Sequence, residues 1–132
     1  MAWHYADLLQ LPVAYVHKVR VSGDEVEARH LTGTVQDLTP VIVDDMISTG
    51  ATIAAAIEVV LENGATPRIW VAGSHGLFTG NVEKRLAPYP IERIFVSDSL
   101  SSPVLETLPI KTVSLGESIA GRIEAISTGQ ID

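Results

Sequence analysis

The sequence predicts an α/β fold in which a parallel sheet lies in the middle of three layers, with helices on both faces. Short β-branched runs alternate along the chain with amphipathic segments, and the runs at 40–43 and 69–72 are apolar throughout. Such runs are typical of strands buried on both faces. Strands that alternate with helices form parallel sheets with right-handed crossovers. Because 132 residues is the size of one domain, we expect 1–132 to form a single domain.

The individual elements follow from the same patterns. We expect strands where an apolar run lies between turns and helices where apolar residues recur every three or four positions. At 25–30, polar and apolar residues alternate after a turn, which indicates a hairpin arm or an edge strand. The expected helices span 5–10, 51–62, 81–86 and 116–126, and the expected strands span 12–16, 25–30, 40–43, 69–72, 91–96 and 107–113.

Composition limits the classes of partner. Nine basic and sixteen acidic residues give a net charge of −7, which argues against nucleic acid, because that binding depends on neutralised phosphates. The chain has no cysteine, which excludes disulfides and favours an intracellular setting. The longest apolar stretch, 51–61, contains Glu58 and is too short to span a bilayer. The first residues lack a secretion signal. We therefore expect a cytoplasmic protein that binds no membrane.

The stretch 41–53 holds the candidate ligand site. A buried strand is followed by Asp44 and Asp45, and a helix is expected to begin soon after. Small residues and hydroxyls lie between them, namely Ser48, Thr49, Gly50, Ala51 and Thr52. The first turn of a helix offers unpaired N–H groups and a partial positive charge, which favour phosphate.

The two carboxylates require a different part of the ligand. Beside the phosphate they would repel it, so we expect Asp44 and Asp45 to accept hydrogen bonds from vicinal hydroxyls some atoms away. A sugar phosphate satisfies both requirements, because it carries hydroxyls for the carboxylates and a phosphate for the start of the helix. Two alternatives stay open, because Ser, Thr or Asp before a helix is commonly a cap and an acidic pair is often only solvated.

As a whole, 41–53 resembles the phosphoribosyl-diphosphate signature of the type I phosphoribosyltransferases and the ribose-phosphate diphosphokinases. The resemblance implies a type I phosphoribosyltransferase-like fold. It implies that Asp44 and Asp45 contact the ribose 2- and 3-hydroxyls, and that 48–52 wraps the 5-phosphate. Ser48 stands where many members have Asp or Thr, and Ala51 where many have Gly, but neither change removes a backbone donor.

Two further segments favour the diphosphokinase branch. The segment 74–80, Ser-His-Gly-Leu-Phe-Thr-Gly, resembles the diphosphokinase sequence Thr-His-Gly-Ile-Phe-Ser-Gly, and 114–123 resembles the closing helix of those enzymes. The similarity covers nearly the whole chain but only the C-terminal half of such an enzyme. We expect His75 to have a supporting role near the phosphate pocket, although a structural residue or a catalytic base stays open. We expect Phe78 to be part of the core.

Lys18 and Arg20 are the candidate catalytic cations. In the diphosphokinases a Lys- and Arg-rich segment at this place stabilises the phosphates of ATP during transfer. Lys18 and Arg20 are two positions apart, so they point the same way on an extended chain. The alternative is a pair of solvated charges. The family's further arginines are replaced here by 21–25, Val-Ser-Gly-Asp-Glu.

The resemblance implies synthesis of phosphoribosyl diphosphate from ATP and ribose 5-phosphate, with Mg²⁺ bridging phosphates and no metal held by protein side chains alone. The family's adenine-binding residues lie in an N-terminal half that does not precede Met1 here. We therefore expect the chain to bind ribose 5-phosphate or phosphoribosyl diphosphate, to use ATP only when that half is supplied, and to be inactive alone. The alternatives are a transferase that joins phosphoribosyl diphosphate to a nucleobase, and a non-catalytic regulatory subunit. We expect the surface that would meet the N-terminal half to be apolar and to favour a homo-oligomer.

Overall fold

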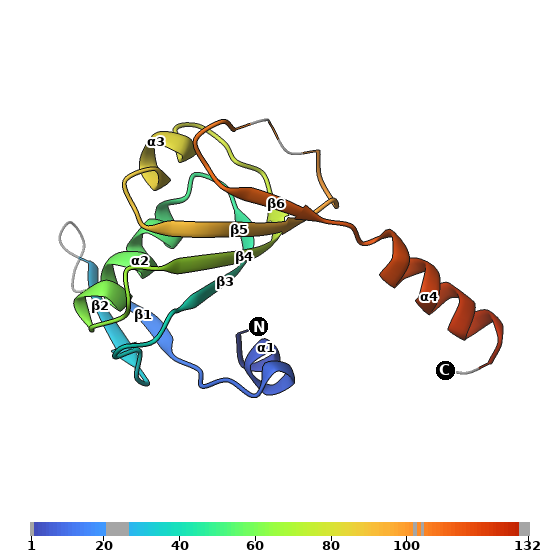
Figure 1. Ribbon diagram of the computed structural model, residues 1–132, viewed down its shortest axis with the longest axis horizontal. Coiled ribbons are helices and arrows are strands. Elements are labelled where there is room, and N and C mark those ends of the chain that lie inside the picture. Colours follow the sequence, from blue (N-terminus) through green and yellow to red (C-terminus); the bar gives the residue numbers. More distant parts are fainter. Residues whose placement is uncertain (1, 21–26, 102, 104, 130–132) are drawn as a thin grey trace.

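The computed structural model describes residues 2–20, 27–101, 103 and 105–129, without the side chains of 18–20 and 27–29. The helices and strands within these ranges are shown in Figure 1. The helices are α1 (Ala2–Leu9), α2 (Ala51–Glu62), α3 (Val82–Leu86) and α4 (Gly116–Ser127). The strands are β1 (Tyr15–Arg20), β2 (Glu27–Thr32), β3 (Val41–Ile47), β4 (Ile69–Gly76), β5 (Ile91–Ser97) and β6 (Ile110–Val113).

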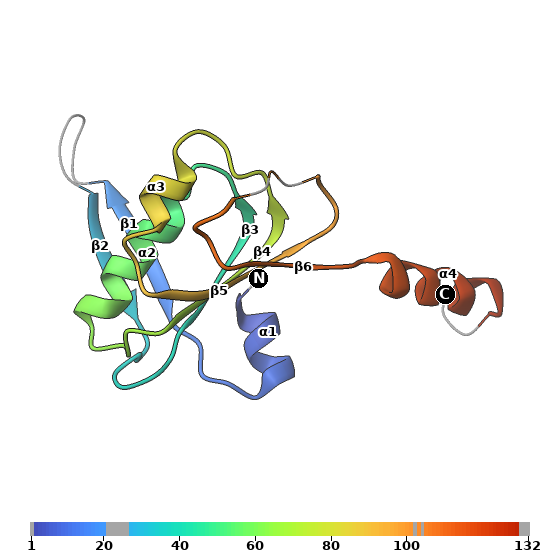
Figure 2. The same ribbon diagram turned by 45° about the horizontal axis from the view of Figure 1, so that its top comes forward.

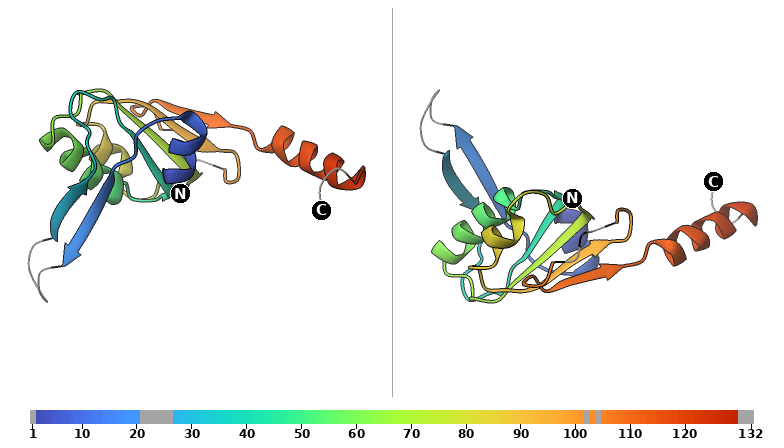
Figure 3. Two further views of the ribbon diagram at one scale, coloured as in Figure 1. Left: turned by 90° about the horizontal axis from the view of Figure 1, so that it is seen from below. Right: turned by 90° about the horizontal axis from the view of Figure 1, so that it is seen from above.

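Four strands form a parallel sheet in the order β3-β4-β5-β6. Helices α2 and α3 pack together on one side of it, and α1 lies on the β3 side, away from β6 (Figures 1 and 2). The expected α/β class, a parallel sheet with flanking helices, is confirmed. Figure 3 shows that the β1–β2 pair projects from this body.

The pair β1–β2 is antiparallel and separate from the parallel sheet. The hairpin arm expected near 25–30 is confirmed as β2. The strand expected at 12–16 is wrong in its bounds, because β1 begins at Tyr15, and Val16 pairs with Leu31 rather than with a strand of the main sheet. Residues 12–14 are therefore a connection from α1 to β1.

The core lies between the sheet and the two helices α2 and α3. From α2, Ile53, Ile57 and Val60 are buried at the helical spacing that the sequence shows. Burying side chains of this size stabilises the fold by roughly 1.5–3 kcal/mol each. The helix ends at Asn63, whose side-chain amide donates to the Val59 carbonyl at 2.8 Å, and Gly64 follows with a positive φ of 84°. The other members of the contiguous buried cluster are Val35, Ile47, Ala54, Ala65, Ile69, Val71, Phe78, Val82, Leu86, Ile94, Val96 and Leu108.

Strand β3 is longer than expected. It continues beyond Val43 to Ile47, so Asp44 and Asp45 lie inside the strand rather than after it. Pairing explains the extension, because Asp44 lies opposite Gly73 and Ile47 opposite Gly76 of β4. The strand expected at 107–113 is shorter, and β6 begins at Ile110.

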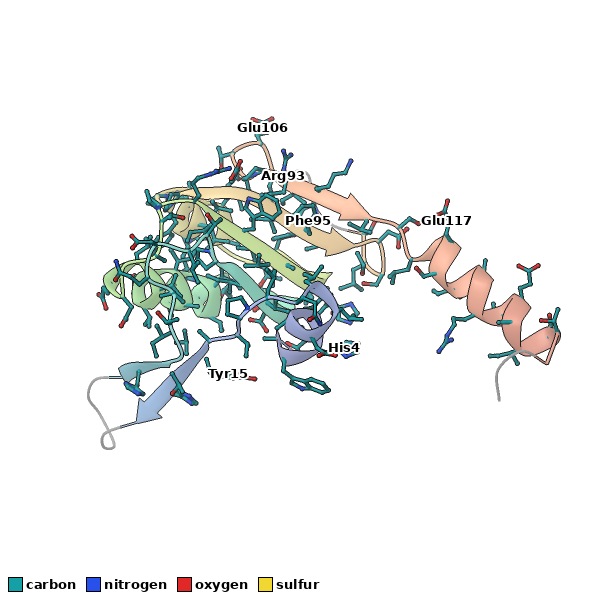
Figure 4. All side chains as sticks on the ribbon, turned by 60° about the horizontal axis from the view of Figure 1, so that its bottom comes forward. His4, Tyr15, Arg93, Phe95, Glu106 and Glu117 are labelled. Carbon is teal, nitrogen blue, oxygen red and sulfur yellow. The ribbon has the colours of Figure 1, made fainter. Side chains whose placement is uncertain are left out.

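Helix α4 stands away from the rest of the molecule (Figures 1 and 4). None of its residues is buried, and Ile119, Ile123 and Ile126 are exposed. Hydrogen bonds hold its start, since Asp98 accepts from the Ser114 hydroxyl at 2.6 Å and from the Leu115 N–H at 2.9 Å. Over the residues that the structure describes, every helix is too short or too polar for a membrane span.

Candidate functional site

The expected site lies where β3 leads into α2. A three-residue loop, 48–50, joins the two elements. Thr49, Ala51 and Thr52 are exposed and Ser48 is half-buried. The structure therefore brings the residues expected around the phosphate into one accessible turn, which begins three positions after Asp45.

The backbone donors at the start of α2 have no partner among the described residues. The first helical hydrogen bond runs from the Ala54 N–H to the Gly50 carbonyl at 2.9 Å. No side chain caps the helix, and no described residue accepts from the N–H groups of Ala51, Thr52 or Ile53. A capping role for the nearby hydroxyls is therefore wrong in this structure, and the amides are available to an anion.

Gly50 makes this turn possible. It is buried and has a φ of 75°, in the left-handed region that favours glycine. A Cβ built there would lie 3.0 Å from Leu86 Cγ and 3.1 Å from Val82 Cγ2, both on α3. The backbone of the loop therefore lies directly against α3.

Segment 77–79 also fixes the loop. The N–H groups of Leu77 and Phe78 both donate to the Ile47 carbonyl at 3.0 Å, and the Thr79 N–H donates to the Ser48 carbonyl at 3.0 Å. The Ile47 and Ser48 carbonyls are thus occupied, whereas no described residue accepts from the amides at the start of α2. Phe78 is buried, so the expectation of a core residue is confirmed.

Asp44 and Asp45 differ in their surroundings. Asp44 is half-buried and Asp45 is exposed. Burial raises the pKa of the Asp44 carboxyl, a hydrogen bond with the Asp45 side chain raises it further, and the Asp45 and Met46 N–H groups oppose the rise. The Asp45 N–H donates to Asp44 Oδ1 at 2.8 Å. Of the pair, Asp45 is therefore the carboxylate more accessible to solvent.

Comparison with known proteins identifies the family to which this chain belongs. The family model described as the phosphoribosyl synthetase-associated domain matches residues 27–131, most of the chain. The chain belongs to this family.

Relatives of the family include ribose-phosphate pyrophosphokinases, another name for ribose-phosphate diphosphokinases. The enzyme of Vibrio parahaemolyticus is 34% identical over 119 residues, which cover 89% of this chain and 38% of that protein. The enzyme of Caldanaerobacter subterraneus subsp. tengcongensis is 30% identical over 129 residues, covering 97% and 40%. A crystal structure of phosphoribosylpyrophosphate synthetase from Mycobacterium smegmatis matches with a TM-score of 0.77 and 28% identity, over 96% of this chain and 40% of that one.

This phosphoribosyl synthetase-associated chain thus spans about two fifths of the length of these relatives. The expected relation to the C-terminal half of the diphosphokinases is confirmed, as is the structural similarity to a synthetase. The roles assigned to single residues stay predictions.

The remaining candidates lie on other elements. The backbones of Lys18 and Arg20 belong to β1, opposite Arg29 and Glu27 of β2, and their side chains lie outside the described part of the chain. His75 lies near the end of β4, opposite Met46 of β3. Its Nδ1 is 2.7 Å from the Ser99 hydroxyl, a contact that suits a structural or supporting residue.

Sequence reasoning missed Arg85. Its guanidinium donates from Nη1 to the Thr49 carbonyl at 2.6 Å, which brings a positive charge from α3 to the loop. The partners are 36 positions apart, and only the adjacent Lys84-Arg85 pair in a short helix marked the place. An adjacent pair of basic residues in a short helix is as typical of a solvent-exposed surface as of a contact with a distant loop.

Proposed function

We propose that this domain binds the sugar phosphate of ribose 5-phosphate or phosphoribosyl diphosphate at the β3–α2 turn. The observation that carries the proposal is that the amides of Ala51, Thr52 and Ile53 find no acceptor in the part of the chain that the structure describes. Ser48, Thr49 and Thr52 add hydroxyl donors, and Gly50 keeps the backbone close to the 5-phosphate. Asp44 and Asp45 accept hydrogen bonds from the ring hydroxyls.

Local charge favours an anion here although the whole chain carries a net charge of −7. The N-terminal end of α2 supplies a partial positive charge, and Arg85 lies against the Thr49 carbonyl. Asp45 lies in β3 and not in the loop itself. A ligand with phosphate at one end and hydroxyls at the other matches this order of charges along the chain.

Mg²⁺ enters this proposal with the substrate. No group of three His, Cys, Asp or Glu side chains among the described residues could hold a metal ion. Mg²⁺ commonly uses one or two carboxylates together with substrate phosphates and water, and Asp45 can supply one such carboxylate. The ion would neutralise charge on the phosphates during transfer.

The proposed reaction needs a second component. In it the 1-hydroxyl oxygen of ribose 5-phosphate attacks the β-phosphorus of ATP, the hydroxyl proton is lost, and AMP leaves. This domain would position the sugar, and Lys18 and Arg20 would stabilise charge on the migrating diphosphoryl group. The ATP site would come from another domain or chain, so the isolated chain should not turn over ATP and ribose 5-phosphate.

Calorimetric titration with ribose 5-phosphate and with phosphoribosyl diphosphate, each with and without Mg²⁺, tests the proposal. Replacing Asp45→Asn should weaken binding by roughly ten- to a hundredfold, since a hydrogen bond to a charged group is worth about 1.5–3 kcal/mol. Glu117→Gln on α4 is the control, because it removes the same charge far from the loop (Figure 4). Absence of binding by the unmodified chain, or equal effects of both variants, would contradict the proposal.

A further inference from the structure

The β1–β2 pair carries two histidines at the same level of its ladder. His17 of β1 lies directly opposite His30 of β2. Side chains that are opposite each other on an antiparallel pair leave from the same face, with Cβ atoms about 4.5–5.5 Å apart. The two imidazole rings are nearly parallel, at 26°, and their centroids are 6.4 Å apart. The hairpin therefore presents two imidazoles side by side.

Both rings are accessible to a ligand. His17 and His30 are exposed, and of the residues whose side chains the structure describes, none hydrogen-bonds to either ring. His75, in contrast, is already engaged with the Ser99 hydroxyl, and His4 lies on α1 rather than on the hairpin. A neutral imidazole has one nitrogen with a lone pair. Each ring of the hairpin pair can therefore give one nitrogen to a metal ion.

Imidazole nitrogen favours one class of metal ion. Zn²⁺, Cu²⁺ and Ni²⁺ bind imidazole, whereas Mg²⁺ prefers oxygen ligands. In a tetrahedral zinc site, Zn–N bonds of about 2.0–2.1 Å put two nitrogens about 3.3 Å apart. Rotation about the side-chain bonds of exposed histidines can bring the rings to this separation without a change of the backbone. The pair thus suits Zn²⁺, an ion distinct from the Mg²⁺ that enters with the substrate.

One hairpin supplies only half of a zinc site. Structural Zn²⁺ is almost always bound by four protein ligands. Over the described ranges of the chain, no third His, Cys, Asp or Glu side chain joins the two histidines. Water could fill the other positions, but the affinity would then depend on two imidazoles alone. A tight site needs two more ligands from outside this chain.

We propose that Zn²⁺ joins two copies of this chain through His17 and His30 of each. A twofold axis through the ion gives the second copy the same pair of ligands, so four imidazoles complete a tetrahedral site. The hairpin projects from the body of the molecule (Figure 3), which lets two hairpins meet while the bodies stay apart. The complete site exists only in the dimer.

The charge of the hairpin does not oppose this contact. Residues 15–32 contain three basic and three acidic residues, so the hairpin has no net charge. The whole chain has a net charge of −7, and two such chains repel each other. A divalent cation between them offsets part of that repulsion. Zinc binding and dimer formation therefore favour each other, and Zn²⁺ shifts the equilibrium towards the dimer.

Sedimentation velocity of the full chain, without a polyhistidine tag, tests the proposal. Relative to the chain in EDTA, Zn²⁺ should double the mass, with saturation at one ion per two chains and reversal by EDTA. Co²⁺ in place of Zn²⁺ should show the intense visible absorption of a tetrahedral ion. The same concentration of Mg²⁺ should leave the mass unchanged, because Mg²⁺ binds imidazole poorly.

Three variants test the location. His17→Gln and His30→Gln each remove two of the four ligands of the dimer, and each should abolish the doubling of mass. His4→Gln is the matched control, because it removes an exposed histidine of α1, and it should leave the doubling intact. All three variants should melt at the same temperature as the unmodified chain in EDTA, since the three side chains are exposed. A lost dimer then reports the ligand and not the fold.

Several results would overturn the proposal. These are an unchanged mass in Zn²⁺, saturation at one ion per chain without a change of mass, equal doubling in Mg²⁺, and doubling that survives His17→Gln or is lost with His4→Gln. None of these results bears on the sugar-phosphate turn, which lies between β3 and α2. The two proposals can therefore fail separately.

Discussion

Replacing Gly50 with alanine perturbs the turn on which the site depends. The left-handed backbone, with a φ of 75°, costs an alanine roughly 1–2 kcal/mol. The added Cβ would lie 3.0 Å from Leu86 Cγ and 3.1 Å from Val82 Cγ2, and crowding of this kind costs typically about 1–3 kcal/mol. We therefore expect the free energy of unfolding to fall by about 3 kcal/mol in total.

Gly80→Ala is the matched control. Gly80 also has a positive φ, 62°, but a Cβ there meets nothing within 4 Å. It should show only the backbone cost of roughly 1–2 kcal/mol, so the difference between the two variants measures the contact with α3.

Urea denaturation followed by circular dichroism gives both free energies. For a domain of this size, a loss of about 3 kcal/mol should lower the Tm by about 10 °C. If Gly50→Ala is as stable as Gly80→Ala, or as the unmodified chain, the described packing of the loop on α3 is wrong.

Further predictions concern charge and α4. Burial, followed by the hydrogen bond with Asp45, raises the pKa of Asp44 in the folded state, so ionised Asp44 opposes folding. Asp44→Asn should therefore raise the Tm at neutral pH and weaken sugar-phosphate binding. The gain in Tm should vanish as the pH falls through the raised pKa of Asp44 and then through the ordinary range of aspartate, because the carboxyl is then neutral in both the folded and the unfolded state. Arg85→Ala should lower stability by about 1 kcal/mol or less and weaken phosphate binding, whereas Lys84→Ala on the same helix should do neither. Hydrogen bonds from the Thr107 N–H and hydroxyl lower the pKa of Glu83, so ionised Glu83 stabilises the fold. Glu83→Gln should therefore lower the Tm at neutral pH. The difference in Tm between the variant and the unmodified chain should shrink as the pH falls through that lowered pKa. Removing α4 should leave the Tm of the rest unchanged in a thermal melt, because no residue of α4 is buried.

Local patterns predicted α2, α3 and α4 to within one residue at each end, whereas α1 begins at Ala2 rather than at the expected residue 5. The stripe of Ile53, Ile57 and Val60, followed by Asn63-Gly64, fixed the bounds of α2 correctly. The same reasoning placed the phosphate-binding candidates at the start of that helix. The bounds of α2 and the place of the phosphate-binding candidates both depend on residues close in sequence, whose helix-forming and helix-ending preferences act within one or two helical turns.

Pairing between distant residues could not be predicted in the same way. Aspartate is rare in strands, so the sequence indicated that β3 ends at Val43, whereas pairing of Asp44 with Gly73 extends it. The apolar run at 12–16 has the composition of a sheet strand, but Val16 pairs with Leu31 of β2 instead. The contact from Arg85 to Thr49 likewise depends on how α3 packs, which no local pattern records.

Titration of the isotope-labelled chain with ribose 5-phosphate, followed by amide chemical shifts, tests the central claim most directly. We predict that the largest shifts occur at the amides of Ala51, Thr52 and Ile53, and that Asp45→Asn reduces affinity without moving their location. Shifts confined to other parts of the chain, or no shifts at millimolar ligand, would contradict a sugar-phosphate site at the start of α2.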